Sequence, residues 1–530
     1  MTSASEGSRP APRRSVLLVA LLAGAALIAG FSMLSGIDPF DEGLMLQAAR
    51  RIGAGQLPYR DFLWAYGPAE PYLLAGLFKL LGTSLLQWRI VLAAADAGVA
   101  VSACLLVRGR APRWLTLSVW LAVACEIAEP RSSDPAPLAL LAMLLALLVV
   151  TGPFTGTKRA VGAGVLVALA AALRIDFALY GFAAAAVAIA APAPRARARD
   201  TAVFSAVAIG LTALVYLPFA LADSPGSLYT ALIGNSLKTR SYWTLPFPLH
   251  FHAPAGAGTA KTLKKAVDFY VPLLSLLGYA LVVAATGFEW LRARRAPARE
   301  LGLVVIGTGL AAYMTSRADA NHAQPLFVVV TIGLALVAGR LGVPRRLSAG
   351  SVTAALGLAV LGLLTLHGVA NRLSALLRPP AAVSLRVPVA DGVQASPAEA
   401  RAIARMVALV DANTTPSQPI YVLPKRSDLV VFSDPLIYVL TQRSNPTSED
   451  FGLQSGAAAQ ARIVAALALV KPRVLVRWTD PLSDRPEPNL RGRPTGVHTV
   501  DDWVTAHYRV MARLYHYTVL IRDGLPGRSG

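Results

Sequence analysis

The sequence has little cysteine and little charge for its length. Its 530 residues include two cysteines, Cys104 and Cys125, and both lie inside apolar runs, so we expect neither a disulfide framework nor a cysteine-based metal site. Charged residues make up 15% of the chain, whereas soluble domains have about 25%. Together with a mean hydropathy of +0.53, these values exclude an ordinary soluble protein and predict a polytopic, α-helical membrane protein.

Several short enzyme motifs are also missing. The glycine-containing segments include no phosphate-binding loop and no dinucleotide-binding signature, and no Gly-X-Ser-X-Gly elbow occurs. The sequence therefore gives no sign of a nucleotide-binding loop or of a serine hydrolase.

Long apolar runs recur along the first 370 residues. About 20 apolar residues cross a bilayer, and the run from Ser15 to Ser35 is long enough to span and has no convincing cleavage signal, so we expect it to be retained. The region 160–191 must contain two spans, divided at Arg174 and Asp176. We predict about eleven transmembrane helices, near residues 15–35, 87–107, 114–129, 136–152, 160–175, 177–191, 201–222, 267–288, 301–316, 323–339 and 347–369.

Basic residues cluster in alternate loops between these spans. Because cytoplasmic loops are enriched in Lys and Arg, we expect a multi-pass protein of the inner (plasma) membrane with a cytoplasmic N-terminus. These clusters explain much of the net charge of +20 without nucleic acid, so we expect membrane lipid, and no nucleic acid, as a partner. The clusters are Arg9, Arg13 and Arg14; Arg108, Arg110 and Arg113; Lys158 and Arg159; Arg195, Arg197 and Arg199; Arg292, Arg294, Arg295 and Arg299; and Arg340, Arg345 and Arg346.

The same topology places the longer loops and the C-terminal part on the extracytoplasmic face. We divide the chain into a membrane module, residues 1–370, with long outer loops at 36–86 and 223–268, and a soluble domain, residues 371–530. In the second part, residues 398–410 and 457–470 have helical patterns, and 420–423, 473–476 and part of 508–522 are typical of strands. We therefore expect a small C-terminal, extracytoplasmic α/β domain.

The stretch from Asp38 to Tyr72 is unusually long and acidic for a connector between membrane helices. Asp38, Asp41 and Glu42 place three carboxylates within five residues, which indicates a site. Adjacent residues at a helix start point about 100° apart, so one of Asp41 and Glu42 could face a reacting hydroxyl and the other a metal or an arginine. The alternative is N-terminal capping by Asp38 or Asp41.

Ionisable residues also stand where other spans meet the outer surface. Asp134 precedes Pro135 at the start of a span, where N-capping is the alternative to a chemical role. Arg174 and Asp176 form one further group, and Arg317, Asp319 and His322 form another. Arginine presents a fork of donors to phosphate, so these groups suit an anionic lipid head group; snorkelling arginines and structural ion pairs are the alternative.

With these residues placed, the pattern resembles the GT-C superfamily of integral-membrane glycosyltransferases, in the branch of protein O-mannosyltransferases and lipid A aminoarabinose transferases. The similarity covers about the first 340 residues, and the order and sidedness of the motifs carry it. The matching positions are Asp41-Glu42, Tyr59-Arg60-Asp61-Phe62, Gly67 to Leu73, Gly82, Arg89, Asp134 to Leu138, Arg174 to Phe177, and Arg317 to Pro325.

The resemblance implies an inverting transfer of a sugar from a polyprenyl-phosphate-linked donor to an acceptor hydroxyl or amine on a glycan, lipid or protein. It implies catalytic roles for Asp41, Glu42 and Asp134, with Asp41 as the general base. Donor phosphate-binding residues would be Arg174, Arg317 and His322, and supporting residues Asp38, Arg60, Tyr72, Asp176 and Asp319. Glu42 and Asp134 could hold a divalent cation, Mg²⁺ or Mn²⁺.

One position departs from the family pattern. Relatives in the aminoarabinose branch have a lysine beside a Pro-Pro pair, whereas this chain has Pro68-Ala69-Glu70-Pro71. The phosphate must then be held elsewhere, or the donor differs.

Two other functions predict different features. A transporter would have acids near the bilayer midplane and broken helices in paired halves, whereas this chain has its acids at one face, apart from Asp96. A non-catalytic scaffold that presents the C-terminal domain would tolerate replacement of Asp41.

Overall fold

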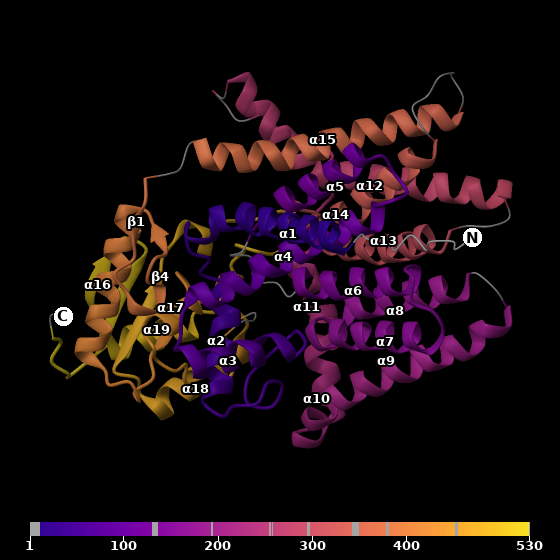
Figure 1. Cartoon of the computed structure of the whole chain (residues 1–530). Coiled ribbons are helices and arrows are strands. Elements are labelled where there is room, and N and C mark those ends of the chain that lie inside the picture. Colours follow the sequence, from indigo (N-terminus) through magenta and orange to yellow (C-terminus); the bar gives the residue numbers. More distant parts are fainter. Residues whose placement is uncertain are drawn as a thin grey trace, which may run out of the picture.

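The computed structural model describes residues 11–129, 136–191, 194–253, 256, 258–293, 297–341, 349–377, 381–450 and 454–528. A bundle of apolar helices carries a mixed α/β domain at one end (Figure 1). The helices of the first part are α1 (Ala11–Met33), α2 (Asp41–Gly53), α3 (Ala69–Leu81), α4 (Leu85–Val107), α5 (Arg113–Glu126), α6 (Ala136–Thr151), α7 (Gly156–Leu173), α8 (Ile175–Ala190), α9 (Pro194–Ala222), α10 (Pro225–Tyr229), α11 (Asn235–Trp243), α12 (Thr259–Ala293), α13 (Ala298–Ser316), α14 (Ala320–Leu341) and α15 (Ala349–Leu377).

A helix occupies most of each predicted span. Within the described ranges, seven helices are long and apolar enough to cross a membrane: α1, α4, α7, α9, α12, α14 and α15. Two of the remaining ones, α6 and α8, are apolar but have 16 residues each. The chain is therefore a multi-pass membrane protein, and the exact count of eleven stays a prediction.

Two of the predicted sites lie at sharp breaks between consecutive helices. Arg174 separates α7 from α8 in an extended conformation (φ −156°, ψ 113°), as the division of region 160–191 predicted. Arg317 separates α13 from α14 in nearly the same conformation (φ −154°, ψ 100°). The break between α7 and α8 is one residue long and that between α13 and α14 covers residues 317–319, so both arginines lie at the ends of packed helices.

The basic loops come together through hydrogen bonds and an ion pair at shared helix ends. Arg299 donates to the Leu106 carbonyl at 2.5 Å and to Thr151 Oγ1 at 3.1 Å. Arg159 pairs with Asp200 at 2.9 Å. These bonds join the ends of α4, α6 and α13, and of α7 and α9, so several predicted cytoplasmic loops lie at common ends of the bundle.

The C-terminal domain is an α/β sandwich. Its four-stranded sheet has the order β3-β4-β6-β5; β3 and β4 are parallel, and the other neighbours are antiparallel. Tyr421 and Leu475 pack with α18 and α19 on one face, whereas Val422 and Val476 belong to the cluster on the α16 face, as the two-residue period of strands requires. The elements are β1 (Val383–Ser384), β2 (Gln394–Ala395), α16 (Pro397–Asn413), β3 (Tyr421–Leu423), α17 (Leu436–Leu440), α18 (Ala457–Val470), β4 (Val474–Trp478), α19 (Thr499–His507), β5 (Tyr508–Leu514) and β6 (Tyr517–Arg522).

This arrangement agrees with the expected secondary structure. The two predicted helices appear as α16 and α18, the two predicted strands as β3 and β4, and the last strand pattern as the β5–β6 hairpin. The last membrane helix, α15, ends at Leu377, beyond the boundary predicted at residue 370.

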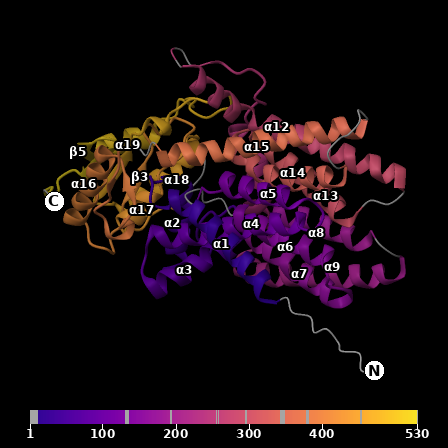
Figure 2. The same cartoon turned by 45° about the horizontal axis from the view of Figure 1, so that its top comes forward.

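The first outer loop joins the two parts. Helices α2 and α3 lie between the bundle and the C-terminal domain in both views (Figures 1 and 2), and residues of α2, α3, α4, α16 and α17 share one hydrophobic cluster. A Cβ added to Gly43 would lie 2.3 Å from the Leu436 nitrogen, so only glycine allows α2 to approach α17 this closely. Arg51 pairs with Asp450 at 2.5 Å, with both side chains buried. The membrane-proximal loop is therefore a packed interface.

Candidate functional site

The start of α2 separates the roles of its acids. The Asp38 carboxylate accepts hydrogen bonds from the backbone amides of Phe40 at 3.1 Å and Asp41 at 3.0 Å, so Asp38 satisfies the helix start that would otherwise need a cap. Asp41 therefore is not needed as the capping residue. Its half-buried side chain lines a cavity instead.

The cavity beside Asp41 has a volume of about 90 Å³ and is also lined by Glu129, Tyr313 and His322. These residues come from α2, from the end of the α5 region, and from α13 and α14. Pockets that hold drug-sized ligands measure roughly 300–1,000 Å³. The cavity can therefore admit the reacting atoms of a substrate, and a whole sugar requires that one wall moves.

Arg174 lies directly behind this cavity. Its guanidinium stacks at 4.6 Å over the ring of Tyr313, which lines the cavity, and pairs with Asp176 at 3.0 Å. The first outer loop packs against the same turn: the Gly67 amide donates to the Leu173 carbonyl at 3.0 Å. A Cβ on Gly67 would lie 2.1 Å from the Ala172 oxygen, so this contact requires glycine. Packing thus brings the loop of Asp41 against the Arg174 turn.

Arg317 is bonded on both sides of its guanidinium. It pairs with Asp319 at 2.8 Å and with Glu487 of the C-terminal domain through two bonds of 2.8 and 3.0 Å. Burial alone would lower the pKa of Arg317, but the bonds to Glu487 and the charge of Asp319 raise it above its usual value. Arg317 is therefore a permanent cation at the junction of bundle and domain.

His322 connects Arg317 with the Asp41 cavity. Asp319 accepts from the His322 backbone amide at 2.9 Å and lies 2.8 Å from His322 Nδ1. Burial alone would raise the pKa of Asp319, but its bonds to His322 and the charge of Arg317 lower it. Since His322 and Tyr313 line the cavity together with Asp41, the bonded residues Arg317, Asp319 and His322 lead to this cavity. Arg174 adjoins the same cavity through its contact with Tyr313.

Glu42 has a different environment from Asp41. Its two oxygens accept from Arg89 Nε at 2.6 Å and Nη2 at 2.8 Å, and neither side chain is exposed. Arg89 also donates to the carbonyls of Met33 and Gly36. Glu42 thus holds the end of α1 and the start of α2 against α4 through one buried ion pair.

The remaining predicted site residues have varied positions. Asp134 lies outside the described residues. Arg60 forms a surface pair with its neighbour Asp61 at 2.8 Å. Tyr72, on α3, is 38% exposed and contacts Phe219 edge-to-face. These two supporting residues therefore lie on the outside of the first loop, and neither of them lines the Asp41 cavity.

Several residues at the site were not predicted from the sequence. The ring of Phe432 lies 4.1 Å from Phe40, the neighbour of Asp41, and stacks on Trp243 at 4.8 Å. Arg491 stacks on Phe432 at 4.5 Å and pairs with Glu487 at 2.7 Å. The only local signal is the four-residue spacing of Glu487 and Arg491 in a proline-rich segment, and such a spacing does not reveal contacts with residues far away in the chain.

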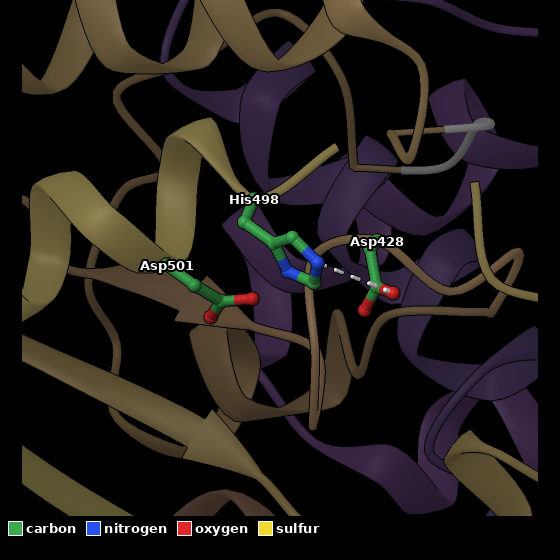
Figure 3. A group of neighbouring side chains, drawn as sticks. All are labelled: Asp428, His498 and Asp501. Atoms are coloured by element: carbon green, nitrogen blue, oxygen red, sulfur yellow. Dashed lines mark ion pairs between the residues drawn. The ribbon is translucent and has the colours of Figure 1, made fainter. Parts of the chain in front are cut away.

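A carboxylate–histidine cluster lies within the C-terminal domain (Figure 3). Each of Asp428, His498 and Asp501 offers a ligand atom, and these atoms lie within 4.8 Å of one another. The carboxylate of Asp428 is already bonded to Arg426 at 2.7 and 2.9 Å, and Asp501 is bonded to Arg477 and Ser427. Because arginines already neutralise both acids, the cluster suits a structural ion network better than a cation.

The predicted metal ligand Glu42 also fits a cation poorly in this arrangement. Both of its oxygens are saturated by Arg89 inside a site with no exposure, so a metal would have to break a buried ion pair. The other predicted ligand, Asp134, is outside the described residues.

Comparison with solved structures shows a similar fold over nearly the whole chain. ArnT from Cupriavidus metallidurans bound to undecaprenyl phosphate aligns with a TM-score of 0.57 and 14% identity, over 98% of this chain and 100% of ArnT. The Archaeoglobus fulgidus oligosaccharyltransferase in its apo form aligns with a TM-score of 0.52 and 12% identity, over 89% of this chain and 70% of that chain. No family model matches the sequence, and no curated protein matches it.

Proposed function

We propose, from the premise that this chain has the fold of the GT-C glycosyltransferases, that it transfers a sugar from a polyprenyl-phosphate-linked donor to an acceptor on a glycan, lipid or protein. The reaction inverts the anomeric centre, because one carboxylate serves as the base for a direct displacement. One of the similar structures is described as bound to undecaprenyl phosphate and another as in complex with a dolichol-phosphate, which supports a donor of this class.

The observation that carries the proposal is the position of Asp41. The Asp38 carboxylate accepts the backbone amide of Asp41, and the Asp41 side chain lines the cavity that His322 and Tyr313 also line. The acceptor hydroxyl or amine must lose a proton as it attacks the anomeric carbon, so a carboxylate within hydrogen-bond reach acts as the general base. The leaving phosphate gains charge, which fixed cations stabilise; Arg317 and Arg174 are the cations next to the cavity.

The other predicted residues support these groups. Asp319 orients His322, a predicted phosphate-binding residue, through two bonds, and Asp176 forms an ion pair with Arg174. Glu42 acts as a positioning residue because its oxygens are held by Arg89. Asp134 stays a predicted second acidic position. No step is assigned to Mg²⁺ or Mn²⁺, since Glu42 is not arranged as a ligand.

We place the site on the extracytoplasmic face of the plasma membrane. The basic loops meet at helix ends through the bonds of Arg299 and Arg159, whereas Arg317 contacts the C-terminal domain. Lys- and Arg-rich loops favour the cytoplasm, so the N-terminus is cytoplasmic and the C-terminal domain extracytoplasmic.

Replacement of Asp41 tests the proposal. The purified full-length protein is analysed by mass spectrometry for bound polyprenyl phosphates, and transfer is then assayed with the matching sugar-linked donors. Asp41→Asn should abolish transfer while expression and melting temperature persist, whereas Asp223→Asn, which removes an exposed acid at the end of α9, should have no effect. A fully active Asp41→Asn protein would exclude Asp41 as the base.

A further inference from the structure

Two arginines from different parts of the fold bind a single carboxylate. Glu487 Oε1 accepts from Arg317 Nη2 at 2.8 Å and from Arg491 Nη1 at 2.7 Å, and Oε2 accepts from Arg317 Nη1 at 3.0 Å. Asn489 adds a bond to Oε2 at 3.0 Å. Arg317 also pairs with Asp319 at 2.8 Å, so the two arginines face two carboxylates, and Glu487 is the carboxylate that both arginines share.

The geometry of this set leaves room for another oxyanion. Arg491 Nε is buried and has no hydrogen-bond partner among the described residues. The side chains of Arg317, Arg491 and Glu487 retain 17, 12 and 15% exposure, so solvent and a ligand can reach them. An anion with more oxygens than a carboxylate could accept a hydrogen bond from this unused Arg491 Nε–H donor.

A phosphate fits these two arginines better than Glu487 does. Arginine forks bind carboxylates and phosphates in the same bidentate geometry, and a phosphate monoester carries about −1.5 to −2 charges near pH 7 with three terminal oxygens. In the place of Glu487 it would accept from both arginine forks and offer a third oxygen to Arg491 Nε. Glu487 offers the arginines only two oxygens and one negative charge, so it binds them less strongly than a phosphate monoester would.

The set also lies beside the proposed reaction site. Arg491 stacks on Phe432, and Phe432 contacts Phe40, which precedes Asp41. Arg317 donates to the carbonyl of Trp243, whose ring stacks on Phe432. An anion held between the arginines would therefore lie next to the first outer loop, at the junction of the bundle and the C-terminal domain.

We propose that Arg317 and Arg491 together bind the phosphate monoester of the polyprenyl phosphate that the transfer releases, and that Glu487 occupies this position when no lipid phosphate is bound. The inference rests on the proposed function for the identity of the ligand, and it assigns a binding residue, Arg491, to the C-terminal domain. Binding of the lipid phosphate displaces Glu487 from the two arginines.

Binding to the purified full-length protein tests this inference without turnover. The probes are undecaprenyl phosphate in detergent micelles and inorganic phosphate. Losing a charged hydrogen-bond donor should weaken binding about 10- to 100-fold in Arg491→Gln, and Arg491→Lys, which keeps the charge, should lose less. Glu487→Gln removes the competing anion and should tighten binding, by about 3- to 10-fold on the same scale. The matched control is Arg493→Gln, an exposed position in the same segment, with binding unchanged.

Arg491→Gln should weaken binding and Glu487→Gln should tighten it, and these opposite directions distinguish a binding site from ion pairs that only attach the domain. If the ion pairs only attach the domain to the bundle, Glu487→Gln and Arg491→Gln should lower the melting temperature together and weaken binding together, which would overturn the inference. A response to Arg491→Gln with inorganic phosphate alone would assign the site to a free anion and also overturn the role in binding the lipid phosphate. Asp41→Asn should bind undecaprenyl phosphate normally, so failure of the transfer proposal remains separable from failure of this one.

Discussion

Replacing Glu42 with Gln should destabilise the attachment of α2 rather than remove a chemical group. Both side chains of the Glu42–Arg89 pair have no exposure, and the two bonds measure 2.6 and 2.8 Å. Removing one partner leaves a buried charge without a counter-ion, at a cost of about 3–5 kcal/mol. A cost of this size changes a local docking equilibrium by roughly 100-fold to a few thousand-fold.

A double replacement separates structure from chemistry. Replacing a buried ion pair by neutral groups is often neutral or stabilising, so Glu42→Gln combined with Arg89→Gln should recover most of the lost stability. The amide in place of the guanidinium also keeps a donor for the Met33 and Gly36 carbonyls. If Glu42 is a positioning residue, the double variant should regain transfer activity as it regains stability.

The assay combines melting in detergent, followed by tryptophan fluorescence, with sugar transfer measured on the same preparations. Each single variant should melt earlier and transfer less than the unmodified protein. Unfolding of so large a chain is not expected to be two-state, so melting midpoints are used for ranking. A double variant with normal melting and no transfer would refute the reasoning and assign Glu42 a chemical role.

Three further predictions follow from other contacts. Gly43→Ala should reduce transfer and lower the melting midpoint because the new Cβ would lie 2.3 Å from the Leu436 nitrogen, whereas Gly53→Ala in the same helix, with nothing within 4 Å, should be neutral or stabilising in the same assays. Burial alone would raise the pKa of Glu487, but Arg317 lowers it, so its contribution to stability is present above the usual glutamate pKa of about 4.3 and is lost as pH falls through the lower folded value. The melting midpoint should therefore depend on Glu487 at pH 7 and cease to do so in strong acid, and an equal effect of Glu487→Gln at both pH values would contradict this. Transfer should continue in EDTA because Glu42 is saturated by Arg89; inactivation by EDTA that Mg²⁺ or Mn²⁺ reverses would show that a cation is required.

The membrane-spanning pattern was predictable because hydropathy is a local property. Each apolar run forms a helix irrespective of its neighbours, since a backbone in lipid must satisfy its own hydrogen bonds. The break at Arg174 could be placed because two spans had to fit into one apolar region, and the structure puts one extended residue there. The α16 and α18 helices and the β3 and β4 strands likewise follow from local periodicity.

The acids at the start of α2 show where local pattern stops being sufficient. The sequence left open whether Asp38 or Asp41 caps the helix, because several acids near a helix start satisfy the same composition rule. Only the folded structure shows that the Asp38 carboxylate accepts the amides of Phe40 and Asp41. Local sequence also cannot reveal the partner of Glu42, because Arg89 is 47 positions away.

By itself the sequence determined the membrane class, the helical spans, the clustering of basic loops and the presence of a separate α/β domain, because each depends on residues close together in the chain. Only the tertiary structure decided that Arg317 meets Glu487, 170 positions later, and that Arg491 and Phe432 adjoin the loop of Asp41. Such contacts arise from the packing of the C-terminal domain on α2, where Gly43 lets two backbones approach, and no local pattern encodes which distant charges that packing brings together.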